Sequence, residues 1–262
     1  MAITDELNHR AYASDGARAA YANPARWRLF PAEEVVLNKL RPEIENREIL
    51  DIGIGGGRTT DALLSISHRY CGIDYSETLV EAARQRFNLN TLYTCDVRDM
   101  RRFANDRFDF AMFSFNGIDN LSHDGRIRGL REIHRVLKSR AILLFSTHNR
   151  DWRHLRKFPW QMPGWWRSPA IRLSIKTLAR LPRHIRMRRL ETSEKDYEIV
   201  NDGGFGYRIL NYYISIDSQI EQLESLGFTG VEAYGMNGEV VTADTEAPFI
   251  HYVARKGATK SG

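Results

Sequence analysis

The chain has 262 residues, of which 42% are hydrophobic and 27% charged. This composition is ordinary for a globular protein and excludes collagen-like, low-complexity and disordered chains. No run of about 18 apolar residues occurs, and the N-terminus has acids where a secretory signal would have basic residues. The two cysteines, Cys71 and Cys95, are too few for a disulfide framework and too isolated for a zinc site. We therefore expect a cytoplasmic protein.

The net charge of +5 is unevenly distributed along the chain. Residues 150–189 contain twelve Lys or Arg and one acid, which gives +11 for this segment and −6 for the rest. Four of the five tryptophans lie in the same segment, at positions 152, 160, 165 and 166. The segment is therefore foreign in composition to the chain around it and is best interpreted as an insertion.

A regular alternation of strands and helices is predicted from residue 48 onwards. After a helix over 31–40, apolar runs predict strands at 48–54, 70–74, 91–95, 108–115 and 141–147, with helices at 59–67, 77–86 and 125–137 between them. The alternation stops after residue 150 and resumes with a helix at 218–226 and strands at 228–234 and 249–255. These elements predict an α/β fold with a doubly wound, mostly parallel sheet of seven strands.

The first strand ends in a glycine-rich turn, in which residues 51–58 read Asp-Ile-Gly-Ile-Gly-Gly-Gly-Arg. Such a turn lets the backbone approach a ligand and directs helix N-terminal amides toward it. A dinucleotide site would need a small residue where Arg58 stands, and Asp51 suits a ligand with a positively charged amino group. Asp74 ends the second strand, where an acid can accept hydrogen bonds from two ribose hydroxyls.

This turn resembles the first motif of the class I S-adenosylmethionine-dependent methyltransferases, an acid followed by three glycines at alternate positions. Residues 94–100 resemble the third motif of that family, and residues 107–112 resemble the start of its fourth strand. The resemblance covers residues 48–148 and, more weakly, 217–256. It implies a Rossmann-like sheet and S-adenosylmethionine as the cofactor.

The resemblance also implies which residues surround the cofactor. Asp51 and Gly53 would hold the methionine part, Asp74 the ribose, and Asp96 with Val97 the adenine. Other residues expected around the cofactor are Gly55, Gly57, Arg58, Tyr75 and Phe115. The alternative is that the glycines only form a tight turn and that the acids only cap strand ends, but four motifs in the right order favour a cofactor site.

Candidate catalytic residues follow the fourth and fifth strands, because the acceptor meets the cofactor at the carboxyl ends of strands in such a sheet. Asn116, Asp119 and His123 follow the fourth strand, and His148 follows the fifth. We expect them to orient an acceptor or take its proton, although His123 at the surface and His148 in a structural hydrogen bond are alternatives. His251 lies within the last strand and is interpreted as packing. One acid at this edge does not make a metal site, so no metal is predicted.

We predict a single methyltransferase domain over residues 1–262. Its parts are an N-terminal lid and helix (1–47), a cofactor-binding core (48–148), a basic Trp-rich insertion with a hairpin (149–210), the C-terminal end of the core (211–256) and a disordered tail (257–262). Tyr12, Tyr21, Trp27 and Arg28 lie in the lid, either against the cofactor or in ordinary packing.

The favoured function is methyl transfer to an O or N atom of a small molecule such as a sugar, an amine or a secondary metabolite, with the insertion as a lid. The basic, aromatic insertion leaves an RNA methyltransferase open, although no RNA-binding module is visible. Residues 169–181 could form a helix with one apolar and one basic face, which leaves peripheral membrane contact and a lipid-linked glycan acceptor open. A non-enzymatic protein that retains the cofactor fold is the remaining alternative.

Overall fold

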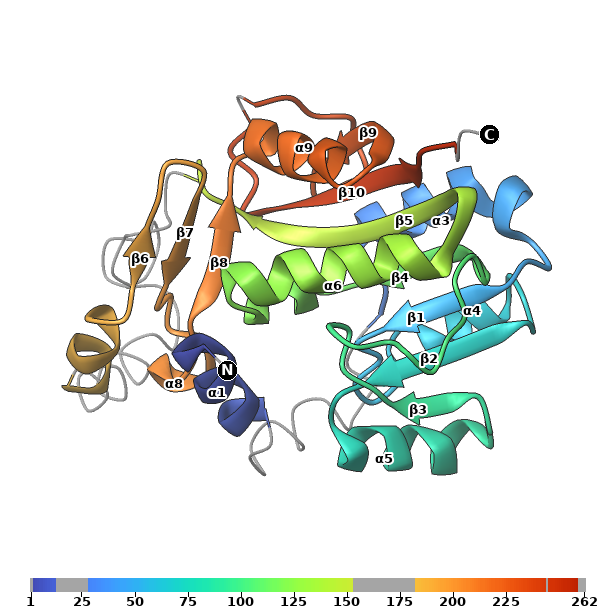
Figure 1. Cartoon of the computed structure of the whole chain (residues 1–262), viewed down its shortest axis with the longest axis horizontal. Coiled ribbons are helices and arrows are strands. Elements are labelled where there is room, and N and C mark those ends of the chain that lie inside the picture. Colours follow the sequence, from blue (N-terminus) through green and yellow to red (C-terminus); the bar gives the residue numbers. More distant parts are fainter. Residues whose placement is uncertain (1, 13–27, 153–181, 244, 259–262) are drawn as a thin grey trace, which may run out of the picture.

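The structure, a computed structural model, describes residues 2–12, 28–152, 182–243 and 245–258 and is built around one twisted sheet (Figure 1). Seven strands pair in the order β3-β2-β1-β4-β5-β10-β9. The first five in the chain run parallel to one another, whereas β10 is antiparallel to both β5 and β9. The predicted α/β fold with a mostly parallel, seven-stranded Rossmann-like sheet is therefore confirmed. The strands are β1 (Ile49–Ile52), β2 (Tyr70–Asp74), β3 (Leu92–Thr94), β4 (Phe108–Phe113), β5 (Leu137–Asn149), β9 (Phe228–Tyr234) and β10 (Phe249–Lys256).

Helices cover both faces of the sheet, as strands that are buried on both sides require. One face packs against α3 (Pro31–Ile44), α4 (Thr60–Leu64) and α5 (Glu77–Phe87), and the other against α6 (His123–Val136) and α9 (Ile216–Ser225). Successive side chains of a strand point to opposite faces, so Ile49 joins the first core and Leu50 the second. Asp51 shares the face of Ile49.

The sheet continues beyond β5 through three strands at the left of Figure 1, of which two lie in the predicted insertion and the third, at 211–214, directly follows it. The end of β5 pairs in parallel with β8 (Asn211–Ile214), which pairs antiparallel with β7 (Tyr197–Val200), and β7 pairs with β6 (Thr192–Ser193). The short helix α8 (Gly204–Tyr207) connects β7 to β8, where the hairpin is expected. The extension therefore projects directly from the edge at which β5 ends. Four predicted features lie outside the described residues: Tyr21, Trp27, most of the Trp-rich insertion with its 169–181 helix, and the end of the tail.

The N-terminal helix α1 (Ile3–Tyr12) lies across the carboxyl edge of the sheet and is attached both to the core and to the extension. The buried Asp5 carboxylate accepts a hydrogen bond from the Ser122 backbone at 2.7 Å, at the start of α6. The buried Asn8 side chain donates to the Leu210 carbonyl at 2.7 Å and accepts from its N–H at 2.9 Å, at the entry to β8. These contacts join α1 to the core and to the extension.

A buried ion pair connects the first turn of α3 to the glycine-rich turn. Arg58 donates to both oxygens of Glu33 at 2.7 Å, and Ser114 after β4 hydrogen-bonds to both residues. Burial opposes ionisation of Glu33, but Arg58 outweighs it and holds the pKa of Glu33 below its ordinary value. Glu33 also accepts a hydrogen bond from the backbone of Phe30. The pair therefore fixes α3, the turn and the end of β4 relative to one another.

Replacing Glu33 with Gln should destabilise the fold, because Arg58 would remain buried without a counter-charge. We expect a loss of about 3 kcal/mol in the free energy of unfolding by urea. The lowered pKa adds a pH signature: the stability from Glu33 is present above its ordinary value of 4.5 and disappears as the pH falls through its lower folded value. Glu33→Gln should lack this acid-dependent component.

The matched control for this prediction is Glu34→Gln, since the neighbouring Glu34 is exposed. It should change stability by less than about 0.5 kcal/mol. Equal effects of the two substitutions would show that the Glu33–Arg58 pair contributes nothing specific.

Candidate active site

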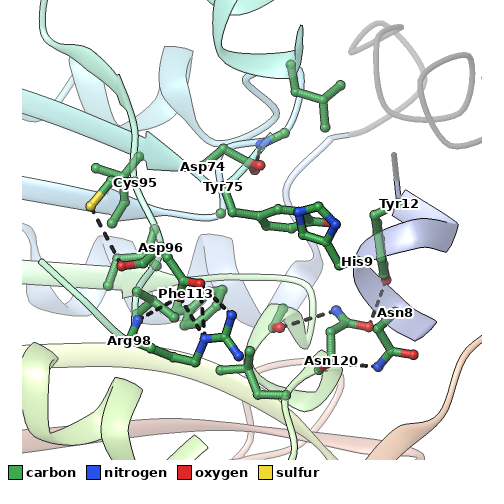
Figure 2. Close-up of a pocket in the computed structure, with 18 of the residues that line it drawn as sticks. Asn8, His9, Tyr12, Asp74, Tyr75, Cys95, Asp96, Arg98, Phe113 and Asn120 are labelled. Atoms are coloured by element: carbon green, nitrogen blue, oxygen red, sulfur yellow. Dashed lines mark hydrogen bonds and ion pairs between the residues drawn. The ribbon is translucent and has the colours of Figure 1, made fainter. Parts of the chain in front are cut away.

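A pocket lies over the carboxyl ends of β1 to β4, beneath α1 (Figure 2). Its walls come from four separate segments of the chain, and α1 supplies Asp5, Asn8, His9 and Tyr12 on the remaining side. The structure brings together seven of the ten residues expected around the cofactor: Gly53, Gly55, Asp74, Tyr75, Asp96, Val97 and Phe115. Asp51, Gly57 and Arg58 are not among the lining residues.

The glycine-rich turn forms the floor of the pocket because it carries no side chains there. Gly53 has a φ of +69°, and a Cβ at this position would lie 2.9 Å from the Phe113 ring. Gly57 has a φ of +87°, and its Cβ would lie 2.2 Å from the ring of Phe87 on α5. A side chain is therefore excluded at both positions by an aromatic ring, that of Phe113 at Gly53 and that of Phe87 at Gly57, and of the two only Gly53 lines the pocket.

Asp74 lies in the wall of the pocket with its carboxylate held in place by the backbone. Gly55 N–H donates to Oδ2 at 2.9 Å and Ser76 N–H donates to Oδ1 at 2.8 Å. Burial raises the pKa of Asp74 above its ordinary value, although these two hydrogen bonds oppose the shift. Each oxygen retains capacity for a further donor, which is the arrangement that binding a ribose diol requires.

Asp51 lies directly below the turn, on the α4 side of the sheet. Its Oδ2 accepts hydrogen bonds from Thr59 at 2.6 Å and Tyr70 at 2.8 Å, whereas its buried Oδ1 has no partner among the described residues. Burial raises the pKa of Asp51 to about 6 despite the two hydrogen bonds. Asp51 therefore places a titratable negative charge beneath the pocket rather than in its wall.

Arg98 is a pocket residue that sequence reasoning missed. Its guanidinium donates to both oxygens of Asp96, at 3.0 and 2.5 Å, and forms an ion pair with Asp5 of α1 at 2.8 Å (Figure 2). Burial opposes ionisation of Asp96, but Arg98 lowers the pKa of that carboxyl below its ordinary value. An arginine two residues after the acid of the third motif was the available signal, but the contact with α1 is visible only in the folded chain.

A second constellation lies beside the pocket, at the ends of β4 and β5. Asp119, in the 3-10 turn η2 (Gly117–Asn120), is fully buried and accepts hydrogen bonds at 2.7 Å from both the backbone N–H and Nδ1 of His148. Because a carboxylate only accepts, Nδ1 carries the proton in neutral His148 and the lone pair is on Nε2. Nε2 lies 3.3 Å from Nδ2 of Asn116, whose neighbours Phe115 and Gly117 line the pocket.

Arg126 supports this pair from beneath and was also missed. It is fully buried, contacts Asp119 Oδ1 at 2.5 Å, and also donates to Gln219 of α9 at 2.5 Å and to Thr147 at 3.1 Å. Thr147 donates to the same Asp119 oxygen at 2.5 Å. Asp119 therefore accepts from four donors, two of which belong to His148.

The other two histidines considered from the sequence lie elsewhere. His123 accepts or donates a hydrogen bond with the Tyr212 hydroxyl at 2.9 Å and stacks on Tyr197 at 4.2 Å, and burial lowers its pKa. His148 packs against Tyr213, which points to the opposite face of β8 from Tyr212, so the structure does not bring the two histidines together. His251 is buried among aromatic rings, as expected, and burial lowers its pKa to about 4.

Two further properties of the described residues bear on the site. No group of three or more His, Cys, Asp or Glu in them is arranged to hold a metal ion. None of the helices in that part of the chain has the length and apolar character needed to cross a membrane. The fold and the pocket together define a Rossmann-like domain that binds a nucleoside-containing ligand at its carboxyl edge.

Comparison with known proteins identifies the class more narrowly. Residues 49–140 match a family model described as a methyltransferase domain. A probable S-adenosylmethionine-dependent methyltransferase of Mycobacterium tuberculosis is 27% identical over 121 residues, which are 46% of this chain and 43% of that protein. A ubiquinone biosynthesis O-methyltransferase of Coxiella burnetii is 29% identical over 115 residues, 42% of this chain and 47% of that protein. The chain thus spans less than half the length of these curated relatives.

Solved structures share the fold over most of the chain. A Burkholderia thailandensis 1,6-didemethyltoxoflavin-N1-methyltransferase, bound to its substrate and S-adenosylhomocysteine, has a TM-score of 0.58 at 16% identity and covers 98% of this chain and 92% of that one. A Mesorhizobium loti S-adenosylmethionine-dependent methyltransferase has a TM-score of 0.57 at 16% identity and covers 86% and 97%. Residues 49–140 therefore match a methyltransferase domain, and the motif order and fold agree with a class I S-adenosylmethionine-dependent methyltransferase, whose cofactor is S-adenosylmethionine.

The residues of the pocket fit this cofactor. Gly53 and Gly55 line the pocket, so the turn presents backbone rather than side chains to the space for the ligand. The unpartnered Asp51 Oδ1 supplies negative charge beneath the turn, which suits a positively charged amino group. Asp74 offers free acceptor capacity to a diol, and Val97 supplies an apolar wall for a base. The individual role of each residue stays a prediction.

Asp74→Asn should weaken cofactor binding. Both carboxylate oxygens accept hydrogen bonds, from Gly55 and Ser76 and, when the cofactor is bound, from two ribose hydroxyls. An amide has only one acceptor oxygen, and its nitrogen donates. We expect the dissociation constant of S-adenosylhomocysteine, measured by calorimetry, to rise by about tenfold or more. Asp217→Asn, an exposed acid on α9, is the control and should leave binding unchanged. Unchanged affinity in Asp74→Asn would remove this residue from the cofactor site.

Cofactor affinity should also depend on pH through Asp51. With a pKa of about 6, this carboxyl takes up a proton as the pH falls through 6 and no longer attracts the cofactor's amino group. Calorimetric titrations from pH 5 to 8 should therefore show weaker binding at the acid end, and Asp51→Asn should flatten the profile. Asp61→Asn, an exposed acid of α4, should retain it. A profile that Asp51→Asn leaves intact would assign the pH dependence to another group.

Proposed function

We propose that this protein transfers the methyl group of S-adenosylmethionine to a hydroxyl group of a small molecule, with His148 as the general base. The observation that carries the proposal is the buried Asp119 carboxylate 2.7 Å from Nδ1 of His148, beside the cofactor pocket. A hydroxyl must lose its proton to become a strong nucleophile, whereas a neutral amine needs little more than desolvation. A histidine oriented by a buried carboxylate therefore favours oxygen over nitrogen as the acceptor atom.

The chain's own residues divide the work of such a reaction. The bound cofactor supplies a methyl group on a positively charged sulfur, from which it leaves by in-line displacement. His148 takes the acceptor's proton on Nε2, and Asp119 stabilises the imidazolium that forms. Arg126 and Thr147 bind the other oxygen of Asp119 and keep the carboxylate oriented. The glycine-rich turn, Asp74 and α1 hold the reactants in position, and such positioning alone can lower a barrier by about 7–11 kcal/mol.

The comparisons support a small-molecule acceptor. The Coxiella burnetii relative is named as a ubiquinone biosynthesis O-methyltransferase, and the Burkholderia thailandensis structure holds the small molecule 1,6-didemethyltoxoflavin. Both names belong to those proteins, and the second methylates nitrogen. They favour a small molecule over a nucleic acid as the acceptor. They do not indicate the acceptor atom, and the proposal of an oxygen rests on the geometry of His148.

The alternatives from the sequence depend on the basic segment at 150–189, most of which lies outside the described residues. RNA as the acceptor, or a lipid-linked glycan at a membrane surface, would each require this segment to bind a polyanion. Nothing in the described pocket favours either one. They therefore stay secondary to the small-molecule proposal. The cytoplasmic location stays a prediction from the sequence.

His148→Gln should abolish most turnover while leaving the cofactor bound. Loss of a general base typically lowers the rate by about 10²–10⁴-fold, and His148 does not line the cofactor pocket. Release of S-adenosylhomocysteine should be measured with a panel of hydroxylated and amino compounds, and cofactor affinity by calorimetry. The matched control is His68→Gln, an exposed histidine, which should retain full activity.

Three results would contradict the proposal. Near-normal turnover by His148→Gln would show that catalysis needs no general base and depends on positioning alone, which would favour an amine acceptor. Equal loss of activity and of cofactor affinity would indicate a structural role for His148. Methylation of RNA with no methylation of any small molecule would replace the acceptor class altogether.

A further inference from the structure

The backbone after β4 takes an uncommon course beside the cofactor pocket. Phe115 and Asn116 are consecutive residues with φ values of +54° and +53°, in a backbone region that residues other than glycine rarely adopt. The Asn116 N–H donates to the buried Ser146 hydroxyl at 2.9 Å, and its carbonyl accepts from the Asp119 N–H at 3.0 Å. These bonds maintain the strained course, which turns the Asn116 side chain toward His148. Strain of this kind is concentrated at ligand sites.

Only one of the two polar atoms of the Asn116 side-chain amide has a hydrogen-bond partner among the described residues. Its Nδ2 lies 3.3 Å from Nε2 of His148, while its Oδ1 is buried and has no partner among the described residues. The residue is 8% exposed, so bulk water does not compensate for the missing bond. A buried acceptor without a donor is costly, and native proteins normally pair such an atom with protein, water or ligand. The amide orientation itself agrees with the proton on Nδ1 of His148, because Nε2 is then an acceptor for Nδ2.

Two acceptor atoms lie at the same edge of the pocket: Nε2 of His148, which the Asn116 amide contacts, and the unpartnered Oδ1 of that amide. Oδ1 is bonded to the same carbon as the Nδ2 atom that lies 3.3 Å from Nε2. This contact is long for a hydrogen bond and can be given up to a better donor. A ligand with two donors that displaces it would find Nε2 of His148 and Oδ1 of Asn116 as its two acceptors.

We propose that Asn116 and His148 together recognise an acceptor that carries two neighbouring hydrogen-bond donors, as in a vicinal diol, an ortho-dihydroxy ring or a 1,2-amino alcohol. This inference rests on the proposed function. The reacting hydroxyl donates its proton to Nε2, and the adjacent O–H or N–H donates to Oδ1. Asn116 is thus a specificity residue: a compound with a single donor leaves the buried Oδ1 unpaired and is disfavoured.

Matched compound pairs test this proposal. S-adenosylhomocysteine release is measured with catechol against 2-methoxyphenol, with cis-1,2-cyclohexanediol against cyclohexanol, and with 2-aminocyclohexanol against cyclohexanol. In the unmodified protein the paired-donor compounds should have a kcat/KM at least about tenfold higher than their single-donor partners. Binding of the same compounds in the presence of S-adenosylhomocysteine should show the same preference.

Two variants of Asn116 separate its side chain from its backbone. Asn116→Gly removes the amide but tolerates the positive φ, so it should fold normally and lose the preference for paired donors. Asn116→Asp keeps an acceptor oxygen and should retain a preference. His148→Gln reports the proposed function independently.

The outcomes are distinguishable. A tenfold preference that Asn116→Gly abolishes and Asn116→Asp retains supports the proposal. Turnover of single-donor compounds at rates equal to their partners, or a preference that survives in Asn116→Gly, overturns it and leaves His148-dependent methylation of hydroxyls standing. Absence of turnover and binding for every compound, with the cofactor bound, overturns both.

Discussion

The structure at the working edge of the sheet depends on one buried carboxylate, Asp119. A fully buried carboxylate is tolerated only when its oxygens are paired, and here one oxygen takes Arg126 and Thr147 while the other takes two groups of His148. These donors come from α6 and from β5. Arg126 in turn reaches Gln219 on α9. The pairing of this one buried carboxylate therefore connects η2, α6, α9 and β5.

The same pairing separates two environments on either side of the sheet extension. Tyr212 packs under the Arg126 guanidinium at 4.5 Å and beside His123, whereas Tyr213 lies against His148 at 4.8 Å and donates to Asp202 at 2.9 Å. Neighbouring residues of β8 thus serve opposite purposes, one completing the buried network and the other forming a wall next to the candidate base. A one-residue change in the register of β8 would exchange the two faces, so the attachment of the extension to β5 in this register determines which tyrosine lies against His148.

The sequence was sufficient for the fold and for much of the pocket, because both depend on local signals. Strand ends, glycines with positive φ and acids at fixed distances after strands are all readable along the chain, and β2 and β9 occupy the residues predicted for them. Arg126 could not be predicted in this way. It lies near the start of α6, and an arginine in a helix is normally exposed. Its complete burial depends on Asp119, Thr147 and Gln219, which come from η2, β5 and α9.

The N-terminal helix links the two halves of the site in the same non-local manner. Through Asp5 it reaches Arg98, which also holds Asp96 on the cofactor side. Through Asn8 and Tyr12 it reaches Asn120, which directly follows the base-orienting Asp119, and Asn8 also binds Leu210 at the entry to β8. A helix held at both sides lies over the pocket in the same position in which it contacts η2 and the entry to β8. The wall of the pocket and the contacts with η2 and β8 therefore belong to one arrangement of this helix.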